Sequence, residues 1–120
     1  MENKKVVYIS GPITGVHNYR EVFEKVEDLL SDLGFIPLSP ARLPQGMTNE
    51  AYMRIDFAMI DSADAVLFLP GYEQSRGAML EFKYCCYTDK KVAFMFVMRS
   101  GVDEIVRANF KRYLEQVIEG

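Results

Sequence analysis

The sequence predicts an α/β domain in which helices cover both faces of a parallel sheet, a three-layer sandwich. Strand and helix patterns alternate along the whole chain, which is typical of parallel sheets. Two strand candidates, residues 65–69 and 92–98, are apolar at nearly every position, as expected of strands covered on both faces. The chain has 120 residues, enough for one hydrophobic core but not for two, so we expect a single domain over residues 1–120.

The first third of the chain predicts a strand, a turn and a long helix. Residues 5–10 (K-V-V-Y-I-S) are rich in β-branched and aromatic side chains, which favour a strand. Residues 11–15 form a turn with two glycines. Residues 19–33 carry apolar side chains three and four positions apart, so they predict an amphipathic helix, and Gly34 is placed to end it.

The middle of the chain repeats the alternation. Residues 35–39 predict a short strand, and Pro37 inside it places this strand at an edge of the sheet, because proline cannot donate a ladder hydrogen bond. Residues 40–47 contain two prolines and a glycine and predict a surface loop, long enough to reach over a pocket. A helix follows over residues 49–62, and then the apolar strand 65–69.

The stretch 70–88 contains the turn after the apolar strand and the helix that carries Glu81, and the other elements are interpreted in relation to it. It turns sharply after the apolar strand and enters a helix at Ser75. This helix is apolar on nearly every side, so we expect it to be buried on nearly every side. The strand 92–98 follows, and an amphipathic helix over residues 102–117 closes the chain.

Right-handed crossovers between these elements favour the strand order 2-1-3-4 in a sheet of four strands, or of five. This is a Rossmann-like or flavodoxin-like arrangement. Its topological switch point lies between the first and third strands, where ligands bind at the carboxyl ends. The turn 11–15 and the loop 70–75 therefore converge on one crevice.

Glu81 is the most informative single residue, because it is a carboxylate in the middle of an apolar helix. Burial of an unpaired charge costs several kcal/mol, on the order of 3 to 5. Glu81 therefore either faces a cleft or forms a structural ion pair with Lys83, Lys90 or Arg54. Ser75 lies at the start of the same helix, where backbone N–H groups bind anions. Together these features suggest a pocket for a small phosphorylated ligand.

Three aspartates lie in the second predicted helix or between it and the next strand. Asp56 lies one turn from both Tyr52 and Ile60, near the apolar boundary of its helix. Asp61 and Asp64, at the end of that helix and the start of the next strand, are interpreted as solvated or capping carboxylates.

Composition excludes several classes of function. A net charge of −3 and a pI near 5.2 argue against binding to a long nucleic acid, but not against a single nucleotide. No apolar run reaches the length of a membrane span, and the first residues lack the apolar core of a signal peptide. Cys85 and Cys86 are adjacent and read as reduced thiols of a cytoplasmic protein. No metal-ligand spacing is found, so we expect neither a metal nor another cofactor.

The ordered set of Y-I-S-G-P-I-T-G, Asp56 ahead of the A-D-A-V strand, and S-R-G-A-M-L-E-F resembles the nucleoside 2-deoxyribosyltransferase superfamily. That superfamily includes the transferases and the deoxynucleoside 5′-monophosphate N-glycosidases, and the resemblance covers roughly residues 5 to 90. It implies that Glu81 is the nucleophile, that Asp56 handles the leaving base and that Tyr8 hydrogen-bonds the nucleophile. It also implies that Ser75 contacts a 5′-phosphate, since the glycosidases have serine there and the transferases an acidic residue.

The converging loops and the resemblance together predict the residues that contact substrate: Ser10, Gly11, Pro12, Ile13, Gly71, Ser75 and Gly77. In the first loop the glycosidases have serine and arginine where this chain has Pro12 and Thr14, so two phosphate contacts are missing. No strand is predicted after the last helix. In some members of the superfamily a segment in that position inserts into a neighbouring subunit, and this chain is expected to lack it.

The resulting expectation is an N-glycosidase that hydrolyses a (2′-deoxy)nucleoside 5′-monophosphate through a covalent glycosyl-Glu81 intermediate. Two alternatives stay open: transfer of deoxyribose between bases, and binding or sensing of a nucleotide without turnover. The apolar helix surfaces further suggest a homodimer or a larger homo-oligomer.

Overall fold

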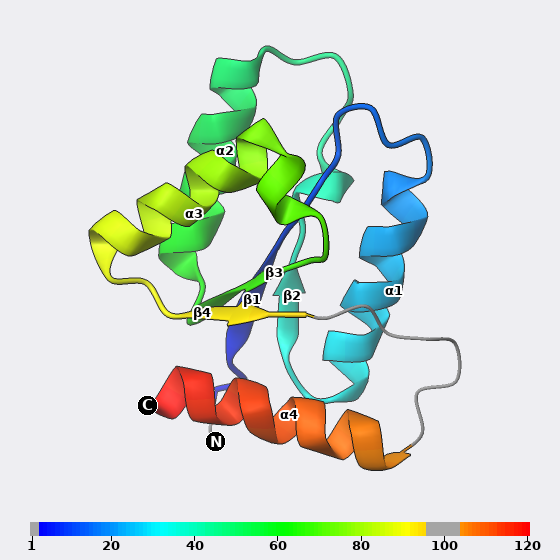
Figure 1. Cartoon of the computed structure of the whole chain (residues 1–120), viewed down its shortest axis with the longest axis vertical. Helices are drawn as coiled ribbons and strands as arrows, with labels where there is room; N and C mark the ends of the chain where they lie inside the picture. The colour runs from blue at the N-terminus through cyan, green and yellow to red at the C-terminus, as the bar shows by residue number, and fades with distance from the viewer. Residues whose placement is uncertain (1–2, 96–103) are drawn as a thin grey trace.

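The structure, a computed structural model, describes residues 3–95 and 104–120 and contains the predicted alternation of strands and helices (Figure 1). Two short 3-10 helices, η1 (Pro40–Arg42) and η2 (Tyr72–Gln74), lie in the loops after the second and third strands. The main elements are β1 (Val6–Ser10), α1 (Tyr19–Asp32), β2 (Ile36–Leu38), α2 (Asn49–Ser62), β3 (Ala65–Phe68), α3 (Arg76–Thr88), β4 (Val92–Phe94) and α4 (Glu104–Glu119).

The sheet is parallel and has the order β2-β1-β3-β4, which confirms the predicted topology. Val7 of β1 is in register with Pro37 on one side and with Ala65 on the other. Pro37 therefore lies in an edge strand, as predicted. β1 and β3 are the two central strands, and their carboxyl ends form the switch point.

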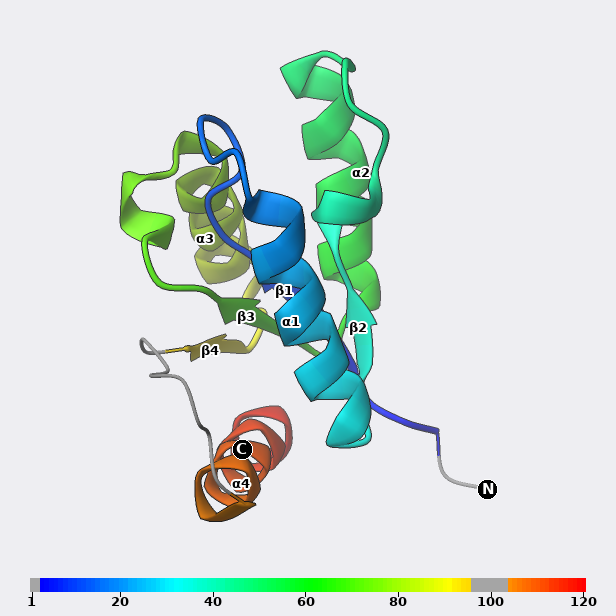
Figure 2. The same cartoon turned by 90° about the vertical axis from the view of Figure 1, so that its right-hand side faces the viewer.

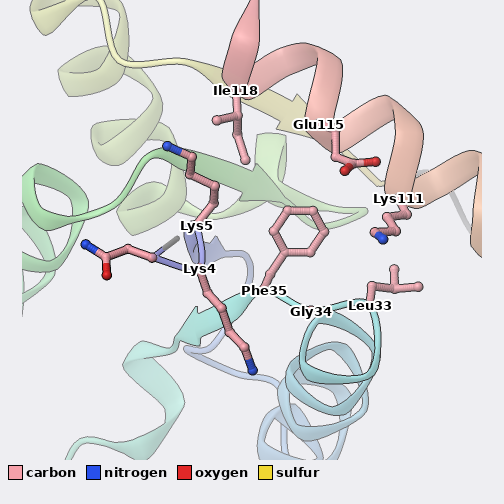
Figure 3. Close-up of a pocket in the computed structure, with 9 residues that line it drawn as sticks. Lys4, Lys5, Leu33, Gly34, Phe35, Lys111, Glu115 and Ile118 are labelled. Atoms are coloured by element: carbon pink, nitrogen blue, oxygen red, sulfur yellow. The ribbon is translucent and has the colours of Figure 1, made fainter. Parts of the chain in front are cut away.

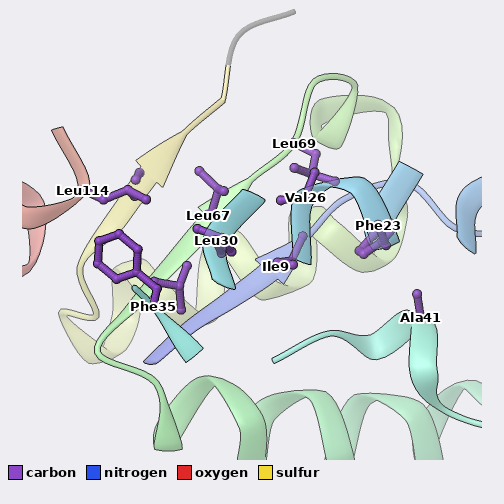
Figure 4. Close-up of a cluster of buried hydrophobic side chains, with 11 residues drawn as sticks. Ile9, Phe23, Val26, Leu30, Phe35, Ala41, Leu67, Leu69 and Leu114 are labelled. Atoms are coloured by element: carbon purple, nitrogen blue, oxygen red, sulfur yellow. The ribbon is translucent and has the colours of Figure 1, made fainter. Parts of the chain in front are cut away.

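Each face of the sheet carries its own cluster of buried apolar side chains, because successive side chains of a strand point to opposite faces. Val7 and Ile9 point to the face that α1 and α4 cover, where they meet side chains such as Phe23 and Leu114 (Figure 4). Tyr8 points to the other face, where Ile60 of α2 and Cys85 of α3 are buried. The molecule is thus a three-layer sandwich, with α1 on one side of the sheet and α2 and α3 on the other (Figure 1). Figure 2 shows α1 in front of the sheet.

Two expectations about burial are wrong. Helix α3 is buried along one stripe only, formed by Ala78, Glu81 and Cys85, whereas Leu80 is 44% and Tyr87 is 90% exposed. An apolar composition does not bury a helix that has a single layer of sheet beneath it. The fourth strand is only partly buried, because β4 is an edge strand; the predicted strand residues 96–98 and helix residues 102–103 lie outside the described residues.

Side-chain caps begin the two helices that carry the acidic candidates. The Thr48 hydroxyl accepts a hydrogen bond from the Ala51 N–H at the start of α2. The Ser75 hydroxyl accepts one from the Ala78 N–H at the start of α3, at 3.2 Å. Both caps satisfy N–H groups that have no partner inside the helix, so they define where α2 and α3 start. Among the helices described, none is long and apolar enough to cross a membrane.

Candidate functional site

Glu81 lies in the second turn of α3 and faces β1. Its side chain is buried, with the residue 4% exposed, and both carboxyl oxygens accept hydrogen bonds from β1. The Ser10 hydroxyl donates to Oε1 at 2.7 Å, and the Tyr8 hydroxyl donates to Oε2 at 3.2 Å. Tyr8 and Ser10 are two residues apart on one strand, so they point to the same face of the sheet. One buried carboxyl group is therefore held at both oxygens.

Asp56 of α2 is the second buried carboxyl group on this face, with the residue 5% exposed. Its Oδ1 atom is buried and has no hydrogen-bond partner among the described residues. A buried polar atom without a partner is rare in folded proteins and calls for an explanation. Glu81 provides one, since a proton held between the two carboxyl groups gives a side-chain hydrogen bond between them.

The two carboxyl groups affect each other's protonation. Burial, followed by the charge of Asp56, raises the pKa of Glu81 from its usual 4.5 to about 8. Burial also raises the pKa of Asp56. Two buried carboxyl groups this close do not both ionise at neutral pH, so the pair holds about one proton and one negative charge.

Burial keeps the neighbouring groups neutral. It raises the pKa of the Tyr8 hydroxyl well above 10, an effect to which Glu81 and Asp56 add. It raises the pKa of the Cys85 thiol to about 12, and Glu81 adds to this as well. Tyr8 therefore remains a hydrogen-bond donor over the whole physiological pH range.

Contacts between α2 and α3 set the distance between the two carboxyl groups. The rings of Phe57 and Tyr84 are stacked, with centroids 4.2 Å apart and an interplanar angle of 4°. The Tyr84 hydroxyl donates to Asp61 Oδ1 at 2.7 Å. Phe57 follows Asp56 directly and Tyr84 lies one turn after Glu81, so this contact holds the two acidic residues opposite each other.

Asp61 and Asp64 have structural roles, as the sequence indicated. Asp64 Oδ2 accepts a hydrogen bond from the Val6 N–H at 2.7 Å and so anchors the start of β1. The ion pairs considered for Glu81 do not form among the described residues. Lys90 Nζ instead donates to the Ala63 carbonyl oxygen. Arg54 instead forms an ion pair with Glu50, with 3.8 Å between Arg54 Nη2 and Glu50 Oε2.

The loops that follow β1 and β3 converge, as the topology predicted. A side-chain carbon at Gly71 would lie 3.3 Å from Pro12 Cγ, and one at Gly11 would lie 2.9 Å from Leu69 Cβ. Gly71 also has φ of 86°, a left-handed conformation that favours glycine. These glycines allow two loops from different parts of the chain to pack together at the carboxyl ends of the central strands.

The other expected substrate contacts lie around this crossing. Ser75 caps α3, and a side-chain carbon at Gly77 would lie 3.5 Å from Met53 Cε of α2. Ile13 packs instead against the core on the α1 face of the sheet. That these residues contact a substrate stays a prediction.

A separate cavity of about 260 Å³ opens at the opposite, amino-terminal ends of β1 and β2 (Figure 3). Phe35 and Ile118 form part of its apolar wall, and the lysines around it include Lys4, Lys5 and Lys111. None of the acidic or hydroxyl groups around Glu81 lines it, so it plays no part in the candidate site.

The contact between Ser10 and Glu81 is the feature that sequence reasoning did not identify. Ser10 was expected to contact substrate, but its hydroxyl proton is directed to Glu81. The signal was present in the sequence: a hydroxyl two positions after Tyr8 on a strand faces the same side and reaches the same neighbour.

Fold and site together define an α/β domain with a pair of buried carboxyl groups below the switch point of a parallel sheet. The family model described as "Domain of unknown function (DUF4406)" matches residues 5–94, and the chain belongs to this family. No curated protein gives a significant match.

Among solved structures, the chain is similar to a 2-deoxyribosyltransferase from the psychrotolerant bacterium Bacillus psychrosaccharolyticus, a biocatalyst for the synthesis of antiviral and antitumoral nucleosides. The superposition has a TM-score of 0.67 and covers 93% of this chain and 95% of that one, with 17% sequence identity. The chain thus has the fold of a 2-deoxyribosyltransferase, which confirms the fold that the sequence resemblance implied.

Proposed function

We propose that the protein cleaves the N-glycosidic bond of a (2′-deoxy)nucleoside 5′-monophosphate, with Glu81 as the nucleophile. The observation that carries this proposal is the pair Glu81 and Asp56: two buried carboxyl groups that hold one proton between them, with hydroxyl donors on Glu81. Glycosidic cleavage through a covalent intermediate uses this combination, one carboxylate to attack the sugar and one proton for the leaving group. The fold shared with a 2-deoxyribosyltransferase supports the same chemistry.

In the first step, a carboxylate oxygen of Glu81 forms a bond to C1′ while the bond between C1′ and the base nitrogen breaks. The electron pair of that bond goes to the base, and the proton of the carboxyl pair passes through Asp56 to the base. Developing positive charge on the sugar is stabilised by the negative charge of the pair. The product of this step is a free base and a glycosyl ester of Glu81.

In the second step, a water oxygen bonds to C1′ and the ester bond to Glu81 breaks. The electron pair returns to the Glu81 carboxylate, and Asp56 accepts the proton of the water, which restores the original protonation of the pair. If a second base takes the place of water, the same site performs transfer instead of hydrolysis.

The preference for a monophosphate rests on the start of α3. The N–H groups at the start of a helix attract anions, and the Ser75 hydroxyl, which caps the helix as an acceptor, retains its own proton for donation. Arg76 is exposed beside it. A serine at this position does not repel a phosphate as a carboxylate would. We place this activity in the cytoplasm, where nucleotides are abundant and the free thiols of Cys85 and Cys86 stay reduced.

The test is a cleavage assay with nucleosides, 2′-deoxynucleosides and their 5′-monophosphates, with free base measured by chromatography. Wild type should release base from monophosphates, Glu81→Gln should not, and Glu24→Gln, which alters an exposed carboxyl group of α1, should behave as wild type. Release that depends on an added acceptor base would make the protein a transferase. If no substrate is cleaved but a nucleotide raises the melting temperature, the protein binds nucleotides without turnover and the proposal is wrong.

We further propose that the chain forms a homodimer. Leu80 and Tyr87 are seven residues apart on α3, so they share one face of the helix, and both are exposed. Sedimentation equilibrium of wild type and of Leu80→Asp would test this face: the variant should dissociate at concentrations where wild type is dimeric, and a monomeric wild type would refute the proposal.

A further inference from the structure

We infer that Ser10 is a positioning residue of the proposed reaction, one that favours the reactive, ionised form of Glu81. The inference rests on the proposed function and extends it to a residue whose expected role was substrate contact. Ser10 is fully buried at the end of β1, and its hydroxyl makes the shorter of the two hydrogen bonds to Glu81, 2.7 Å against 3.2 Å for Tyr8.

The Ser10 hydroxyl has no second proton to donate to a substrate. A hydroxyl has one proton, and this one points to Glu81 Oε1, so only the oxygen lone pairs remain for any other partner. Because Ser10 is inaccessible to solvent, no water can replace the hydrogen bond if it breaks. A strand position also fixes the direction of the side chain more firmly than a loop does. The Ser10 hydroxyl is therefore a hydrogen-bond donor to Glu81 and not to a substrate.

The other groups around Glu81 either favour its protonated form or favour its ionised form less strongly than Ser10 does. Asp56 on α2 opposes the negative charge of Glu81, and so does burial. Cys85, one turn away on α3, is neutral because its own thiol pKa is raised to about 12. Tyr8 on β1 donates from a longer distance. The Ser10 hydroxyl is thus the strongest single contact that favours the charged form of Glu81.

The same hydrogen bond assists both chemical steps. In the first step it raises the fraction of Glu81 that is a carboxylate and therefore able to attack C1′. In the second step negative charge returns to Glu81 as the ester bond breaks, and a donor on Oε1 stabilises that charge as it develops. A serine at this position therefore compensates in part for the burial that opposes ionisation.

The first experiment measures the titration of Glu81 directly and does not depend on activity. Protein labelled with 13C at the glutamate carboxyl carbons is titrated by NMR, and the Glu81 signal is the one absent from Glu81→Gln. The midpoint should move upward by about one to two pH units in Ser10→Ala, since hydrogen bonds to charged groups contribute about 1.5 to 3 kcal/mol. Ser10→Cys, which keeps the size but donates weakly, should lie between the two. An unchanged midpoint would overturn the inference.

The second experiment uses the reaction. In Ser10→Ala the acidic limb of the kcat/KM profile should shift upward by the same amount, with base release recovering toward the wild-type rate at high pH. A merely structural role would lower the rate equally at every pH and would contradict the inference. Ser62→Ala, which removes an exposed hydroxyl that donates to the Ala58 carbonyl of its own helix, is the control.

The two experiments separate failure of this inference from failure of the proposed function. If wild type cleaves no substrate, the proposed function is wrong, yet the NMR titration still decides whether Ser10 controls the ionisation of Glu81. If Ser10→Ala does not fold, Ser10→Cys carries both measurements, because it preserves the packing at the end of β1.

Discussion

Replacement of Glu81 by glutamine should make the protein more stable at alkaline pH while it abolishes activity. The folded pKa of Glu81, about 8, is above its unfolded value of about 4.5. Between these values the folded state holds a proton that the unfolded state has released, so wild-type stability falls as pH rises through this window. The stability that this bound proton contributes is fully present below pH 4.5 and is lost above pH 8.

The size of this effect follows from the two pKa values. At about 1.4 kcal/mol for each pKa unit, the loss has an upper limit of about 5 kcal/mol. Glutamine resembles the protonated carboxyl group: its carbonyl oxygen can accept from Ser10, and its NH2 group can donate to Asp56, whose Oδ1 lacks a partner in the described part of the chain. The variant therefore avoids the loss, as expected when a buried charge is removed.

The assay is urea unfolding of wild type and Glu81→Gln at intervals between pH 5 and pH 9. The difference in free energy of unfolding should grow in favour of the variant as pH rises, toward the limit of about 5 kcal/mol. A difference that is constant over this range would refute the reasoning, because it would mean that Glu81 binds no extra proton in the folded state. Glu24→Gln, with its exposed carboxyl group, should follow wild type.

Three further predictions follow from the same contacts. Asp56→Asn should lower the rate of base release by about 10²- to 10³-fold, since an amide cannot give a proton to the base; a rate within threefold of wild type would contradict its role. Tyr8→Phe should shift the acidic limb of the kcat/KM profile upward, but less than Ser10→Ala does, because its hydrogen bond to Glu81 is longer. Gly71→Ala should destabilise the fold by about 1 to 2 kcal/mol in thermal unfolding, because its φ of 86° disfavours a side chain and Pro12 lies close; an unchanged melting temperature would argue against this loop packing.

Much of the site could be predicted from the sequence because it depends on local pattern and chain direction. The apolar strands and the period of the helices determine a parallel sheet, and right-handed crossovers bring the carboxyl ends of β1 and β3 together. Glu81 stands out in the sequence because burial of a charge among apolar helix residues is costly unless the charge has a partner or a function. Ser75 was identified as a helix cap because serine and the turn before it define the start of α3.

Only the tertiary structure decided which side chains meet. From the residues alone, Glu81 could form an ion pair with Lys83, Lys90 or Arg54, and the family resemblance implied a hydrogen bond with Tyr8. The fold brings Glu81 against the hydroxyls of both Tyr8 and Ser10. These partners are more than 70 residues away in the chain, so no local spacing reports their distance. Likewise, the apolar composition of α3 did not reveal which of its faces lacks a neighbour, because burial depends on how many layers pack around a helix and not on its composition alone.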